Sequence, residues 1–134
     1  MENNNQHTYL NEKSNYQISD KVIAKIAKKV LDKTDGVLEL QGNILSSITD
    51  TFADGQSTAG ISIDLDENKN AIVNTKIILE YGKKAPEVFA QLDKNIKAEV
   101  RNLTGINVVA VKAEIVDLLT REEYNKKKQN EKNL

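Results

Sequence analysis

The sequence predicts an α+β domain, with a mixed sheet of about four strands and two main helices packed on one face of the sheet. Residues 20–34 and 86–103 carry apolar residues at helical spacing. Residues 61–65, 71–81 and 106–117 instead alternate apolar and polar residues, as half-buried strands do. The second helix lies between two long strands, and such a crossover unit is expected to be right-handed with its strands parallel. The predicted order is α-β-(α)-β-β-α-β.

The first helix is expected to begin after Ser19, because a serine side chain suits the N-cap position and Asp20 favours the positive end of the helix. It is expected to end before Asp35 and Gly36, where glycine suits a C-terminal cap. A short strand follows at residues 37–40. The apolar face of this helix consists of Val22, Ile23, Ile26, Ala27, Val30 and Leu31.

The middle of the chain contains one ambiguous segment and one clear hairpin. The apolar spacing in residues 42–52 fits a short helix better than a strand, and residues 53–58 are expected to form a loop. The strand at residues 61–65 is followed by a turn-forming segment, residues 66–70, and by the long strand that ends at Tyr81.

The second main helix is expected to start at Pro86 and to end near Leu103, with Gly105 as its cap. Its predicted buried stripe is Val88, Phe89, Leu92, Ile96, Val100 and Leu103. In the last strand, the residues expected to alternate on one face are Val109, Val111, Ala113 and Ile115.

The 134 residues suffice for one domain, which we place at residues 18–120. Residues 1–17 are rich in Asn, Gln and Glu and are predicted to form a disordered tail. Residues 121–134 form a charged C-terminal tail, which is either disordered or the frayed extension of a last helix.

The composition excludes several classes of function. The chain has no Cys, which rules out disulfides, thiol catalysis and cysteine-based metal sites. A formal net charge of -1 argues against strong nonspecific attraction to nucleic acid or anionic lipid. The N-terminus lacks the pattern of a signal peptide, and no apolar run approaches the roughly 18 residues of a spanning helix. We therefore expect neither a direct membrane span nor a nucleic-acid partner.

No catalytic, cofactor-binding or metal-binding residue is predicted. His7 is the only histidine, and it lies in the predicted tail, where no fixed geometry supports catalysis or metal binding. The acidic and amide residues of 64–70 resemble the opening of a calcium loop, but Lys69 and Thr75 stand where that loop needs Gly and Glu. This segment is interpreted as a hairpin turn, and the chain is not expected to be an enzyme.

A strand-to-helix junction is the candidate interaction or ligand surface. It consists of Tyr81, Gly82, Lys83, Lys84 and Pro86. Gly82 can leave the strand with a backbone geometry that other residues resist, and the start of a helix attracts anions beside the two lysines. The alternative is a solvated loop, with the Tyr81 ring in the core.

Exposed strand edges suggest a second kind of surface. Unprotected edges pair with other chains unless Lys, Pro or a bulge prevents it. Lys76 and Lys112 are candidates for such protection. A homo-oligomer, formed through an edge or a helix face, therefore remains open.

Five blocks of the sequence together resemble the alkaline-shock, or envelope-stress-response, proteins of Gram-positive bacteria. In order, these blocks are residues 18–30 (ISDKVIAKIAKKV), 34–42 (TDGVLELQG), 46–52 (SSITDTF), 77–89 (IILEYGKKAPEVF) and 103–115 (LTGINVVAVKAEI). Five blocks in this order and at this spacing are hard to obtain by chance.

The resemblance implies a non-enzymatic, cytoplasmic protein of the alkaline or cell-envelope stress response, without a cofactor. It also implies protein–protein interaction, including self-association and recruitment to the inner face of the cell membrane by a membrane-anchor protein of the same family. Related proteins linked to lipid metabolism leave an alternative, which is a regulatory module that binds a small ligand or nucleic acid. The identity of the partner stays open.

Overall fold

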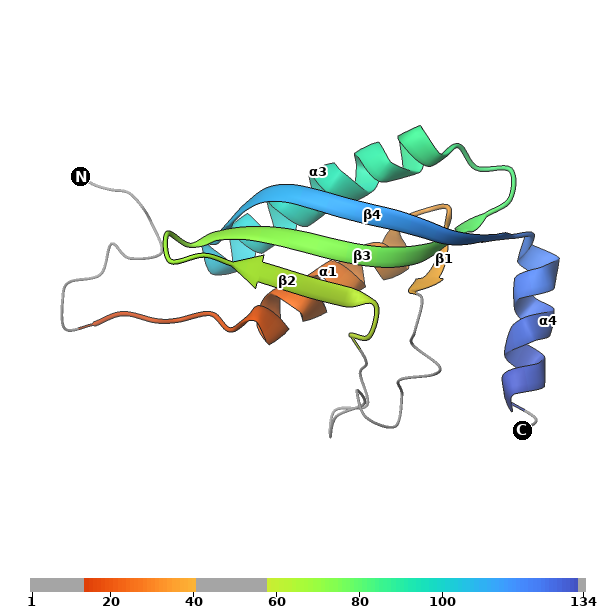
Figure 1. Ribbon diagram of the computed structural model, residues 1–134, viewed down its shortest axis with the longest axis horizontal. Coiled ribbons are helices and arrows are strands. Elements are labelled where there is room, and N and C mark those ends of the chain that lie inside the picture. The colour runs from red at the N-terminus through yellow and green to blue at the C-terminus, as the bar shows by residue number, and fades with distance from the viewer. Residues whose placement is uncertain (1–13, 41–57, 133–134) are drawn as a thin grey trace.

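The computed structural model describes residues 14–40 and 58–132, and it confirms the predicted α+β class (Figure 1). Helices α1 and α3 cover one face of a mixed four-stranded sheet. The elements are α1 (Asp20–Lys33), β1 (Val37–Leu40), β2 (Ile61–Leu65), β3 (Asn70–Glu80), α3 (Ala85–Thr104), β4 (Asn107–Leu119) and α4 (Arg121–Lys132). The helix predicted for residues 42–52 and most of the predicted N-terminal tail, including His7, lie outside the described residues.

Strand β3 is the centre of the sheet. On one side it pairs along its whole length with β4, in parallel, as the crossover prediction required. On the other side β2 pairs antiparallel with the first half of β3, and β1 pairs antiparallel with the second half. Among the strands that the structure describes, β4 pairs with β3 alone, so its outer edge is free.

The core lies between this sheet and the two helices, and it is aliphatic as expected. Burying one Ile, Leu or Val side chain stabilises a fold by about 1.5–3 kcal/mol, and these contacts hold the helices on the sheet. The largest fully buried side chains of this core are those of Ile23, Leu31, Val73, Ile77, Leu92, Ile96, Val100 and Ile106.

The predicted helix ends are largely confirmed. Ser19 occupies the N-cap of α1, although its side chain makes no capping hydrogen bond. Pro86 lies in the first turn of α3. Gly105 caps that helix in the left-handed conformation (φ 81), and its N–H donates to the Arg101 carbonyl at 2.9 Å. A glycine is suited to this place because other residues resist a positive φ.

The buried stripe of α3 ends differently from the prediction. Leu103 was expected inside but is 64% exposed, and Thr104 is buried instead. The Thr104 hydroxyl donates to the Val100 carbonyl at 2.6 Å and accepts the Ile106 N–H at 3.0 Å. These hydrogen bonds offset the cost of burying a polar side chain, so a threonine can occupy the inner position.

The inward alternation predicted for β4 is wrong at Val109, which is 50% exposed. The register between β3 and β4 shifts between Ala71 and Ile72, where Ala71 pairs with Val108 and Ile72 with Ala110. Such an irregularity inserts one extra residue and turns the following side chains to the other face. Val108 and Val111 are therefore the buried residues of this part of β4.

The charged C-terminal segment forms helix α4, which extends the predicted order by one element (Figure 1). The Thr120 hydroxyl accepts the Glu123 N–H at 3.0 Å, and the Glu123 carboxylate accepts the Thr120 N–H at 2.9 Å. This is a capping box, whose T-x-x-E pattern is present in the sequence. Tyr124 is the buried residue of α4 and donates to the Glu39 carboxylate at 3.2 Å.

The residues that resembled a calcium loop form the predicted hairpin turn. One carboxylate oxygen of Asp66 accepts the N–H groups of Asn68 and Asn70, each at 2.9 Å. Lys69 takes a positive φ of 65 in the same turn. The carboxylate thus serves to hold the turn closed.

Candidate interaction surface

The junction between β3 and α3 is held in place by backbone hydrogen bonds and leaves its side chains in solvent. The Tyr81 N–H donates to the Leu119 carbonyl of β4 at 2.7 Å, and the Lys83 N–H donates to the Glu80 carbonyl at 3.1 Å. Gly82 has a φ of +97, and nothing lies within 4 Å of the place where a Cβ would stand. The glycine is therefore needed for the backbone turn and not for close packing.

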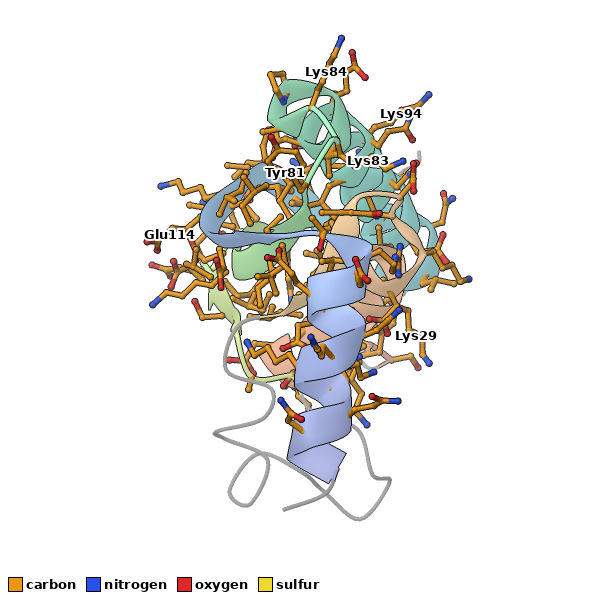
Figure 2. The ribbon with its side chains drawn as sticks, turned by 90° about the vertical axis from the view of Figure 1, so that its right-hand side faces the viewer. Lys29, Tyr81, Lys83, Lys84, Lys94 and Glu114 are labelled. Atoms are coloured by element: carbon orange, nitrogen blue, oxygen red, sulfur yellow. The ribbon has the colours of Figure 1, made fainter. Side chains whose placement is uncertain are left out.

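The five predicted surface residues lie in the connection from β3 into the first turn of α3, at one end of the sheet (Figure 1), and Figure 2 shows the side chains of Tyr81, Lys83 and Lys84 there. The expectation that Tyr81 belongs to the core is wrong, because β3 ends at Glu80 and the Tyr81 side chain is 66% exposed. Lys83, Lys84 and Pro86 are also exposed.

Lys83 joins this junction to the turn after α1. Its ammonium group lies 3.0 Å from the Asp35 carboxylate. The hydrogen bond and the opposite charge of Asp35 raise the pKa of Lys83 above its ordinary value. Both side chains are solvent-exposed, so this pair contributes little to the stability of the fold.

The same turn is packed tightly against α3. A Cβ added to Gly36 would stand 2.6 Å from a methyl group of Val88, and Gly36 has a φ of +99. The Gly36 carbonyl accepts the Glu80 N–H at 2.8 Å. The α1–β1 turn, the end of β3 and the first turn of α3 therefore form one fixed unit.

A groove of about 680 Å³ lies between the end of α1 and the first half of α3. Its charged lining residues are Lys33, Asp35, Lys83, Lys84, Glu87 and Lys94. Of the groove lysines, Lys83 has a carboxylate, that of Asp35, within ion-pair distance, whereas the other three have none among the residues that the structure describes. Lysines outnumber carboxylates in this lining, so the groove is a cationic surface, and two of its lysines, Lys83 and Lys84, follow closely after Tyr81 in the chain (Figure 2).

The described part of the chain shows no constellation of reactive groups. It contains no cluster of three His, Cys, Asp or Glu side chains that could hold a metal ion. The buried polar side chains in it are threonines, and the charged ones are all partly or fully exposed. No helix within residues 14–40 and 58–132 has the length and apolarity to cross a membrane.

The surface also contains an apolar hollow that the sequence did not predict. An apolar hollow of about 230 Å³ lies between the start of α3 and β4. It is lined by Ile77, Ala85, Pro86, Val88, Phe89, Ala113 and Ile115. Ile115 is 41% exposed beside the free edge of β4. The alternating pattern of β4 identified these strand residues but not that the side chain of Ile115 remains uncovered.

A family profile matches most of the chain. The profile of the alkaline shock protein 23 family, which is described as having a cell envelope-related function, matches residues 8–120. The chain belongs to this family. The resemblance to alkaline-shock-type stress proteins is thereby confirmed, and the match includes the whole junction from Tyr81 to Pro86.

Individual relatives are more distant. The chain is 28% identical over 110 residues to the stress response regulator gls24 homolog of Streptococcus pyogenes. That match covers 81% of this chain and 61% of the relative, so the chain spans about three fifths of the relative's length. It is 24% identical over 102 residues to the uncharacterized protein YqhY of Bacillus subtilis, covering 76% of this chain and 75% of that protein. No solved structure matches the chain.

Proposed function

We propose that this chain serves a stress response of the cell envelope by binding other proteins, and that an anchor partner recruits it to the inner face of the cell membrane. The family has a cell envelope-related function, and the streptococcal relatives carry the name of a stress response regulator. Neither name is that of an enzyme.

The observation that carries this proposal is the composition of the junction end. A tyrosine ring, 66% exposed, stands on a turn held by backbone hydrogen bonds. The lysines that follow it closely in the chain, Lys83 and Lys84, line the groove that also contains Lys33 and Lys94. Exposed aromatic residues near charged residues occur in many protein-binding sites. The partner would present an acidic segment with an apolar residue that packs on the Tyr81 ring.

Localisation of the tagged full chain in cells under cell-wall stress tests the proposal. We expect the wild-type chain to gather at the cell periphery and the Tyr81→Ala variant to spread through the cytoplasm. Leu103→Ala is the matched control, because it removes an exposed apolar side chain at the opposite end of α3. A wild-type chain that stays uniformly distributed in stressed cells with all partners present would contradict the proposal.

The lysine groove supports a second candidate, which is a regulatory module for an anionic small ligand or nucleic acid. The groove adjoins the first turn of α3, and the positive end of a helix dipole favours anions. A thermal-shift screen with phosphates, acyl carriers and oligonucleotides separates the two candidates. Stabilisation of the wild-type chain that is lost in Lys84→Glu would favour this second function, and the absence of any shift would remove it.

A further inference from the structure

The free edge of β4 has a charge pattern that fits a second copy of itself. We propose that two copies pair through β4, antiparallel, about a two-fold axis at Ala113. This interface is distinct from the junction end, and it does not depend on the proposed function. It joins the two sheets into one continuous sheet, with the helices of both copies on the same face.

Hydrogen bonds within the sheet show which backbone groups of β4 face outward. The Lys76 N–H donates to the Gly60 carbonyl at 3.0 Å, so the neighbouring Thr75 faces β4 instead. The Thr75 hydroxyl also donates to the Lys112 carbonyl at 3.4 Å, which places that carbonyl on the side of β3. Successive residues of a strand point their N–H and C=O groups to alternate sides. The residues whose backbone N–H and C=O groups point to the outer edge are therefore Val111, Ala113 and Ile115.

Three two-fold registers near the middle of the strand would satisfy these outward groups, with the axis at Lys112, at Ala113 or at Glu114. The first places two lysines opposite each other, and the third places two glutamates opposite each other, and both arrangements are destabilising. With the axis at Ala113, Lys112 of each copy lies opposite Glu114 of the other. Lys112 and Glu114 would face each other as a non-hydrogen-bonded pair, whose Cα atoms lie about 4.5 Å apart, close enough for an ion pair.

Both charged residues are available for this contact. Lys112 and Glu114 are exposed, and neither forms an ion pair with any residue in the described part of the chain. A lysine on an edge strand normally opposes pairing with other chains. Here Glu114 compensates for that lysine in one register, so the edge would reject most strands and accept its own copy.

The helix-covered face fits the same register. Val111 of the second copy would lie opposite Ile115, which is 41% exposed and lines the apolar hollow beneath α3. Ala113 would lie opposite Ala113, so no large side chains collide at the axis. The pairing therefore covers apolar surface on one face and neutralises charge on the other.

Sedimentation of the full chain, with charge-swapped variants, tests the interface. We expect a dimer whose dissociation constant rises about tenfold or more in Lys112→Glu and in Glu114→Lys, because two symmetry-related pairs become repulsive. The double variant restores the pairs and should return the dissociation constant to near the wild-type value. Lys29→Glu is the control, since Figure 2 shows Lys29 on the side of the molecule away from Glu114.

Oxidative cross-linking tests the register itself, because the chain has no natural cysteine. A cysteine at position 113 would meet its counterpart at about 5.5 Å between Cα atoms, within disulfide range. A cysteine at the more exposed position 109 would lie ~27 Å from its counterpart in this register. We expect Ala113→Cys to form a covalent dimer and Val109→Cys not to. A wild-type chain that is monomeric at high micromolar concentration, a dimer indifferent to Lys112→Glu, or faster cross-linking at position 109 would each overturn the proposal.

Discussion

The interior of the domain and its junction end differ in how deeply their side chains are buried. Between the sheet and helices α1 and α3, side chains such as those of Ile96 and Val100 have no exposure. At the junction end, Tyr81 and the lysines of the groove lie in solvent, and hydrogen bonds hold the backbone of the turn. Substitutions in the two regions should therefore affect different measured quantities. Interior substitutions should lower the free energy of unfolding, whereas substitutions of exposed junction side chains should leave it nearly unchanged.

The largest effect is expected from two positions of the same helix. Ile96 is fully buried in α3, whereas Leu103 is 64% exposed. Replacing Ile96 by Ala should lower the free energy of unfolding by about 2–5 kcal/mol, because a buried side chain is lost and a cavity remains. Leu103→Ala should change it by less than about 0.5 kcal/mol. Urea unfolding of both variants measures the contrast, and equal losses would show that the assigned burial is wrong.

Two glycines with nearly the same φ allow the effect of packing to be isolated. Gly36 (φ +99) lies against Val88, whereas Gly82 (φ +97) has open space around it. Alanine is strained at both positions, but only at position 36 does its methyl group also collide with a neighbour. Gly36→Ala should therefore be less stable than Gly82→Ala by about 1–3 kcal/mol in urea unfolding. Indistinguishable stabilities would contradict the close approach of Val88 to the turn.

Helix α4 lies between the two extremes, because one buried side chain connects it to the domain. Removing the Tyr124 hydroxyl, which donates to Glu39 at 3.2 Å, should weaken the docking of the helix by about 0.5–1.5 kcal/mol. Hydrogen exchange should then show faster exchange of the α4 amides in Tyr124→Phe and unchanged protection in α3. Unaltered α4 protection would mean that this hydrogen bond does not hold the helix.

The smallest effect concerns the exposed pair of Lys83 and Asp35. The pKa of Lys83 is raised in the folded chain, so the pair stabilises the fold fully below the unfolded-chain pKa of about 10.4. This stabilisation is lost as the pH rises through the higher folded-state pKa. The difference in Tm between the wild type and Lys83→Met should be small and constant from neutral pH and should vanish at strongly alkaline pH. Lys84→Met, which removes a neighbouring lysine without an ion pair in the described residues, is the control.

Most of the fold could be predicted from the sequence, since local patterns determine most of its elements. Helical spacing located α1 and α3, and alternation located the hairpin and β4. The errors arose where contacts between distant residues determine which side chains are buried. The register shift that exposes Val109 and the hydrogen bonds that bury Thr104 are properties of paired or packed segments, not of local sequence. The contact of Tyr124 with Glu39, 85 positions away, likewise has no local signal.

The candidate surface was predicted as a segment but not as an arrangement. The order of Tyr81, Gly82, Lys83, Lys84 and Pro86 indicated a tight junction, and the structure places it between β3 and α3 at one end of the sheet (Figure 1). The groove depends on Lys33 and Lys94, which come from two helices that meet only in the folded chain. Sequence spacing does not reveal such convergence.

Site-specific photo-cross-linking in stressed cells tests most directly whether the junction end is the binding surface. A photoreactive phenylalanine replaces Tyr81 in one strain and Leu103 in a second strain, so that both ends of α3 carry the same exposed probe. We predict that position 81 cross-links strongly to one membrane protein and that position 103 does not. The same cross-linked proteins at both positions, or cross-links at position 103 alone, would contradict the account.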